Sequence, residues 1–174
     1  AASTIAFLYF QSAFADRGLS NGAIGLILGV VTVINAAEAA SAARMGRYGN
    51  FGQQVVTLTG LTGAGIIGVA SGSLTLAIAA YFVANLASGV IEPVMFTWFN
   101  NQLPSEQRAT LLSVESWVFS MTMIVAFPAA GWLAGAHGWG MLYVLCGGVK
   151  IGLALAMLFV LWRRGPRRAG PATV

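Results

Sequence analysis

Long apolar stretches separated by short polar breaks run the length of the chain, and this pattern limits the fold more than any other feature. A helix needs about 20 mostly apolar residues to cross the hydrocarbon core of a bilayer. Cutting the sequence at its polar and glycine-rich breaks leaves six candidate spans, at residues 1–15, 21–43, 53–71, 74–100, 110–135 and 139–162. The sequence therefore predicts an all-α, polytopic membrane protein, with one domain of six transmembrane helices over residues 1–162.

The opening of the chain differs from that of a secreted precursor. The first candidate span is shorter than the others, and the chain starts at Ala1 without a charged leader. A secretory signal peptide begins with a positively charged region. We therefore expect no signal peptide and expect Ala1 to lie within a longer protein.

The amino-acid composition indicates a chain that lies in a lipid bilayer. It also argues against several classes of ligand. Hydrophobic residues make up 57% of the chain and charged residues 8%, against about one quarter charged in soluble domains. The basic residues lie at predicted helix ends, so we expect no nucleic-acid partner. Cys146 is the single cysteine, which excludes an intramolecular disulfide and a cysteine-based metal site. We expect no metal and no cofactor.

The distribution of arginines predicts how the spans are oriented. Cytoplasmic loops of membrane proteins hold an excess of Lys and Arg. Here the loops after the second and fourth spans and the C-terminal tail carry the excess, and only Arg17 falls on the opposite side. The cytoplasmic set is Arg44, Arg47, Arg108, Arg163, Arg164, Arg167 and Arg168. We expect an integral protein of the plasma (inner) membrane whose basic tail, residues 163–174, is cytoplasmic and partly disordered.

Two predicted helices carry polar stripes. In the fourth span Tyr81, Asn85, Ser88 and Glu92 are spaced by four, three and four residues, which is one helical face. The second span has a similar stripe with members three residues apart: Thr32, Asn35, Glu38 and Ser41. Polar groups in lipid must face protein or water. The candidates for substrate or proton binding are Glu92, Asn85, Ser88, Glu38, Asn35, Gln11 and Tyr81.

Charged residues inside the predicted spans are functional candidates, because a charge in hydrocarbon is costly. Glu92 lies nearest the midplane among the carboxylates, so it is the preferred binding residue. Glu115 lies nearer the cytoplasm and is predicted to close that end as a gate with Arg44, Arg47 and Arg108. Lys150 is near the centre of the last span and either extends to the interface or pairs with an acid on a neighbouring helix.

Two loop motifs carry a family resemblance. Residues 43–49 read ARMGRYG, similar to a D-R-x-G-R-R signature, although Ala43 replaces the acid and Tyr48 the last basic residue. Residues 103–113 read LPSEQRATLLS, similar to P-x-x-x-R-A-T-x-x-S. Both resemble the major facilitator superfamily. The resemblance implies that the six spans are helices seven to twelve, the C-terminal half of the bundle, built as an inverted 3+3 repeat.

The resemblance also implies a function. It predicts secondary transport of a small solute by alternating access, with protons as a candidate coupled ion, and either an N-terminal six-helix half or a second copy as partner. Two alternatives remain open. One is a membrane-embedded interaction module without transport of its own. The other is an intramembrane serine protease using Ser71 and His137, which we disfavour because the expected glycine two residues before the serine is Val69. We expect no enzyme activity.

Overall fold

The computed structural model describes residues 1–45, 51–102, 104 and 107–164, without the side chains of residues 37–45, 100 and 164. All regular secondary structure in this part of the chain is α-helical, which confirms the predicted fold class. The helices are α1 (Ala2–Leu8), α2 (Phe10–Ala15), α3 (Asn21–Met45), α4 (Phe51–Val69), α5 (Leu74–Gln102), α6 (Arg108–His137) and α7 (Trp139–Arg164).

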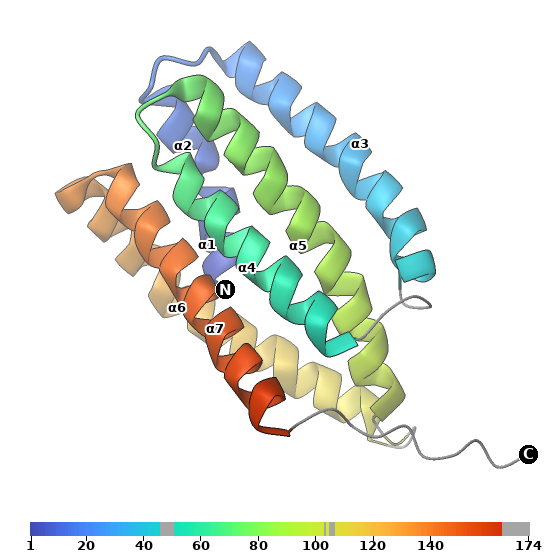
Figure 1. The fold of residues 1–174 in the computed structure, drawn as a ribbon. Helices are drawn as coiled ribbons and strands as arrows, with labels where there is room; N and C mark the ends of the chain where they lie inside the picture. The colour runs from blue at the N-terminus through green and yellow to red at the C-terminus, as the bar shows by residue number, and fades with distance from the viewer. Residues whose placement is uncertain (46–50, 103, 105–106, 165–174) are drawn as a thin grey trace, which may run out of the picture.

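The long helices run side by side as an oblique bundle, and the short helices α1 and α2 lie within it (Figure 1). Helix α4 packs against both α5 and α7, while α3 packs against α5. The first helix contacts α7, α6 and α4. Helix α1 therefore packs among helices from the middle and the end of the chain.

In the described part of the chain, three helices are both long enough and apolar enough to cross a membrane. These segments are Leu74–Phe99, Arg108–His137 and Trp139–Arg163. In α3 the described apolar segment is the shorter Asn21–Ala36, and α4 includes polar threonines and glycines among its 19 residues. The chain thus has the apolar helices of a polytopic membrane protein. That six of its segments cross the bilayer remains a prediction.

The first predicted span is not one helix, because α1 and α2 are separated at Tyr9. The last four carbonyls of a helix lack partners within it. One of them, the carbonyl of Ala6, accepts a hydrogen bond of 3.2 Å from the buried hydroxyl of Tyr143 in α7. A side chain from a distant helix thus satisfies the backbone at the interruption.

Close packing of α4 depends on glycine. A Cβ added at Gly63 would lie 2.9 Å from the carbonyl oxygen of Gly147, and one added at Gly65 would lie 2.9 Å from that of Ala80. Small residues let helix backbones approach in a membrane, where no hydrophobic force drives the helices together. These glycines therefore set the spacing of α4 from α7 and from α5.

An aromatic cluster of the core lies between α2 and α5. Phe10 and Phe14 are completely buried, and Tyr81 is 3% exposed. The Phe10 and Tyr81 rings stack with centroids 4.4 Å apart, and Phe14 meets Tyr81 edge-on. This aromatic cluster fixes which face of α2 points inward. The opposite face, with Gln11 and Ser12, is consequently exposed.

Candidate functional site

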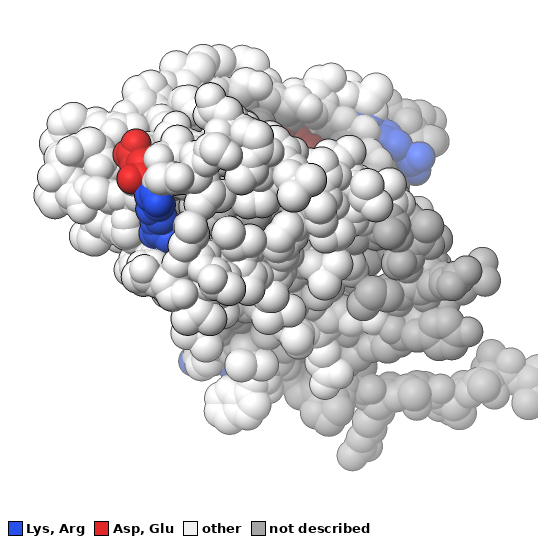
Figure 2. All heavy atoms as spheres, turned by 90° about the horizontal axis from the view of Figure 1, so that it is seen from above, with Lys and Arg blue, Asp and Glu red and all other residues white. Residues whose placement is uncertain are grey.

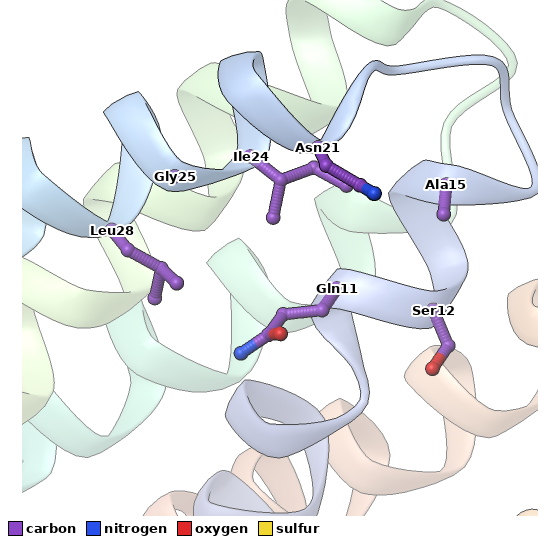
Figure 3. A pocket seen from close by; sticks show the side chains of 7 residues that line it. All are labelled: Gln11, Ser12, Ala15, Asn21, Ile24, Gly25 and Leu28. Carbon is purple, nitrogen blue, oxygen red and sulfur yellow. The ribbon is translucent and has the colours of Figure 1, made fainter.

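A hollow of about 360 Å³ lies between α2 and the start of α3. Its lining residues are Gln11, Ser12, Ala15, Asn21, Ile24, Gly25 and Leu28. In Figure 3 the Gln11 and Asn21 side chains extend into the gap between the two helices, and Ile24 and Leu28 reach into it from α3. Gln11 is a sequence-predicted site residue. Asn21 and Ser12 were not predicted, because only the tertiary packing of α2 against α3 brings them beside it.

The polar stripe of α5 faces the interior of this chain for most of its length. Tyr81, Asn85 and Ser88 are 3%, 8% and 3% exposed. The Asn85 amide donates a hydrogen bond of 2.9 Å to the Tyr81 carbonyl one turn earlier. Their polar groups are thus placed among packed helices rather than against lipid, as the periodicity required.

Glu92 ends this stripe and, unlike the residues before it, is exposed. The Ser88 hydroxyl donates a hydrogen bond of 3.3 Å to its Oε1 atom. Pro93 follows within the same helix, where proline removes a backbone donor. The polar stripe therefore begins at the buried aromatic cluster and ends at the exposed carboxylate of Glu92, which accepts one hydrogen bond from Ser88.

Lys150 lies on the inner face of α7. Tyr143 and Cys146, seven and four residues earlier, share this face and are 1% and 7% exposed. Glu92 is the carboxylate whose charge acts on the Lys150 ammonium, although the described residues hold no salt bridge between the two. Lys150 is partly buried, and the described residues form no ion pair with it.

The other sequence-predicted residues are placed less completely. Asn35 lies on α3 and is exposed, as is Thr32 on the same helix, whose hydroxyl donates to the Leu28 carbonyl at 2.9 Å. The side chain of Glu38 lies outside the described residues.

Half of the predicted cytoplasmic gate is described. Arg108 begins α6, and Glu115 lies seven residues later, which places both on one face of that helix. Both side chains are exposed. Arg47 and the side chain of Arg44 lie outside the described residues. The two described members are thus available for contacts with groups beyond this helix.

Hydrogen bonds attach the first two helices to the last two. The Tyr9 hydroxyl donates to the Phe127 carbonyl at 3.0 Å, and the two rings stack with centroids 4.6 Å apart. The indole N–H of Trp139 donates to a carboxylate oxygen of Asp16. With the Tyr143 contact described above, these bonds hold the middle of the interrupted first span and its C-terminal end.

A serine protease arrangement is not formed by the described residues proposed for it. The Ser71 hydroxyl donates to the nearby carbonyl of Ser73 at 3.1 Å. The His137 ring instead lies against Trp132, with centroids 6.1 Å apart. Without a hydrogen bond between serine and histidine, the hydroxyl lacks the adjacent base that activates such a nucleophile.

The outer surface is mainly apolar. Viewed from the end at which α2 ends and α5 begins, the described atoms are almost all uncharged (Figure 2). Helix α6 is the most exposed apolar element. Its large exposed side chains are Leu111, Val114, Trp117, Val118, Phe119, Met121, Ile124, Val125 and Trp132. Exposed apolar side chains in this number indicate a membrane or protein interface.

Comparison with known proteins gives one family. The family model described as Major Facilitator Superfamily matches residues 1–174. No curated protein and no solved structure matches the chain.

Proposed function

Because the chain belongs to the major facilitator superfamily, a family of transporters of small solutes, we propose that it moves a small solute across the membrane by alternating access, with Glu92 as the residue that binds solute or proton. The observation that carries this assignment is the polar stripe of α5. It buries Tyr81, Asn85 and Ser88 and ends at an exposed carboxylate. An ionisable group inside an apolar bundle needs a hydrated path.

The environment of Glu92 suits a residue that binds a solute or a proton. Ser88 supplies one hydrogen bond, and Lys150 supplies an opposite charge without enclosing the carboxylate. The carboxylate therefore stays accessible to water or solute while a positive charge is nearby. A proton or a cationic group of a solute would bind these oxygen atoms, of which one accepts a hydrogen bond from Ser88.

In this proposal the chain supplies the C-terminal half of the cavity, as helices seven to twelve, and an N-terminal six-helix half or a second copy supplies the rest. Arg44, Arg47, Arg108 and Glu115 close the cytoplasmic end, and the C-terminus is cytoplasmic in the plasma (inner) membrane. The distribution of arginines supports this orientation. The apolar outer faces of α6 and α7 support contact with lipid or with the partner half.

The test uses the intact transporter that carries this chain, reconstituted in liposomes with a pH-sensitive dye inside. Glu92→Gln keeps the shape of the side chain and removes its titration. We expect normal expression and thermal stability, but no solute-dependent proton movement. Glu92→Asp, which keeps the carboxyl group, should retain part of the signal. Normal coupled transport by Glu92→Gln would exclude this role for the residue.

A further inference from the structure

We propose that the exposed face at the end of α7 binds an anionic phospholipid. Arg163 contacts the phosphate, and Phe159 and Trp162 lie at the level of the headgroup. The partner is a lipid of the surrounding membrane rather than the transported solute. The inference therefore goes beyond the proposed function and does not depend on the role of Glu92.

The packing of α7 shows that this face points away from the bundle. A Cβ added at Gly52, near the start of α4, would lie 2.9 Å from the Cδ2 atom of Leu161, so Leu161 points toward α4. Phe159, two residues earlier, lies on nearly the opposite side of the helix. Phe159 and Trp162 are 50% and 76% exposed, and their rings stack with centroids 6.4 Å apart. The end of α7 thus carries an outward aromatic pair.

A second aromatic pair lies at the same end of the bundle. Phe51 begins α4 and stacks on Trp98 near the end of α5, with ring centroids 5.1 Å apart. Helix α4 begins, and α5 and α7 end, on the same side of the bundle (Figure 1). Tryptophan is enriched where the hydrocarbon of a bilayer meets the headgroups. Trp98 and Trp162 therefore indicate that this end lies at a membrane surface.

Arg163 supplies a positive charge beside the outward aromatic pair. Its side chain is exposed, and its Cζ atom lies 4.5 Å from the centroid of the Phe159 ring. This cation–π contact holds the guanidinium at the face. The N–H donors of a guanidinium lie in its plane and match two oxygen atoms of a phosphate. Because no described carboxylate forms an ion pair with Arg163, its charge is available to a lipid phosphate.

The sequence around this face favours an anionic lipid over a zwitterionic one. Arg164, Arg167 and Arg168 follow Arg163, and residues 116–174 include no acidic residue. A basic residue next to a membrane helix attracts anionic lipid by about 1 kcal/mol, or about fivefold in affinity. A zwitterionic headgroup adds an ammonium group that the arginines repel. Net charge therefore selects the class of lipid.

The same face of α7 continues as an apolar surface. Gly152, Leu155, Phe159 and Trp162 are spaced by three, four and three residues, which is one helical face, and all four are exposed. An apolar face that ends in a positive charge matches an acyl chain joined to a phosphate. A protein segment covering this face would have to bury Arg163, which is costly unless the segment supplies an acid. These features favour a lipid as the occupant.

The test uses the fluorescence of Trp162 in the intact protein, reconstituted in phosphatidylcholine vesicles. Bromine atoms on an acyl chain quench a tryptophan that the chain contacts. One series contains increasing amounts of brominated phosphatidylglycerol, and the other contains brominated phosphatidylcholine. The signal that is lost in Trp162→Phe gives the contribution of Trp162. We expect phosphatidylglycerol to quench this contribution at a mole fraction at least about fivefold lower than phosphatidylcholine does.

Trp132 is the matched control for the position of the tryptophan. It is 70% exposed and lies near the end of α6 that precedes α7, so it is at the opposite end of α7 from Trp162. The contribution of Trp132, measured with Trp132→Phe, should be quenched equally by the two lipids.

Substitutions then connect the lipid preference to Arg163. Arg163→Gln should lower the preference by about fivefold, and Arg163→Lys, which keeps the charge, should retain part of it. Arg17→Gln removes the same charge near the start of α7, where the neighbouring Asp16 contacts Trp139. This variant should leave the preference unchanged. Salt should weaken the preference, because it screens exposed charges.

Several outcomes would overturn the inference. Equal quenching of Trp162 by the two lipids would show that the face does not select charge. An unchanged preference in Arg163→Gln, or an equal loss in Arg17→Gln, would exclude Arg163 as the phosphate ligand. No quenching of Trp162 by either lipid would show that protein covers the face. None of these measurements involves transport, so normal coupling in Glu92→Gln would exclude the role of Glu92 and leave the lipid site standing.

Discussion

The hydroxyl of Tyr9 reaches the carbonyl of Phe127 at 3.0 Å, and it does so through space left by a missing side chain. A Cβ added at Gly131 would lie 2.6 Å from that hydroxyl oxygen. Gly131 follows Phe127 by one helical turn on α6. The Tyr9 hydroxyl therefore occupies the space that a side chain at Gly131 would fill on α6. The two helices that make this contact are more than 100 residues apart in sequence.

Gly131→Ala should destabilise the chain by about 1–3 kcal/mol, because the Tyr9 hydroxyl must move and lose its acceptor. Thermal unfolding in detergent would measure the change. Gly135→Ala is the matched control on the same helix, since a Cβ there meets no atom within 4 Å.

Tyr9→Phe should rescue much of the Gly131→Ala loss, because it removes the oxygen atom that the new methyl group would contact. Equal stability of Gly131→Ala and Gly135→Ala would contradict the claim that Gly131 makes room for the Tyr9 hydroxyl. So would a failure of Tyr9→Phe to restore any stability to Gly131→Ala.

The contact between α4 and α7 gives a second prediction. A Cβ at Gly147 would lie 2.6 Å from the carbonyl oxygen of Gly63 and 2.5 Å from Cγ1 of Ile67. Because one of these atoms is backbone, Gly147→Ala must separate the helices, with an expected loss of about 1–3 kcal/mol. Gly148→Ala, next in sequence and open to space, should be neutral or stabilising. The unfolding temperatures of the two variants test this prediction. Similar temperatures would contradict the claim that Gly147 allows α4 and α7 to approach closely.

The all-α fold could be predicted because the apolar length of a helix is a local property of the sequence. The polar face of α5 was also recognised, since Tyr81, Asn85 and Ser88 follow helical spacing. The burial of this face against Phe10 and Phe14 depends on how α2 folds back into the bundle. Periodicity alone cannot show whether such a face is packed or open.

The interruption at Tyr9 had no local signal, because no glycine or proline lies in residues 1–15. Its partners, Phe127 and Tyr143, come from the other end of the chain. The hollow was missed for a similar reason. Asn21 and Ser12 belong to different helices, and only the packing of α2 against α3 makes them neighbours.

The proposed orientation can be tested by labelling from each side of the membrane. In a Cys146→Ala background, single cysteines replace Gln107 and Ser73, which are both exposed. They lie just before α6 and just before α5, so one helix separates them. We expect Gln107→Cys to react only from the cytoplasmic side and Ser73→Cys only from the opposite side. Reaction of both from one side would contradict the topology.

The electrostatic relation between Glu92 and Lys150 gives the last prediction. If the two charges attract, neutralising either one leaves the other without its partner, and neutralising both costs less than the sum of the single changes. For Lys150→Met and Glu92→Gln we expect a coupling energy of about 0.5–1 kcal/mol in a double-mutant cycle of unfolding free energies. The value is modest because Glu92 is exposed.

The cycle needs two controls. The amino group of Ala1 also interacts with both charges, so the cycle should be run with Ala1 joined to a preceding residue, which removes that charge. A parallel cycle pairs Lys150→Met with Glu115→Gln, whose carboxylate is not among the charges that act on Lys150. It should show no coupling, because distant sites are additive. Equal coupling in both cycles would mean that Lys150 responds to net charge rather than to Glu92.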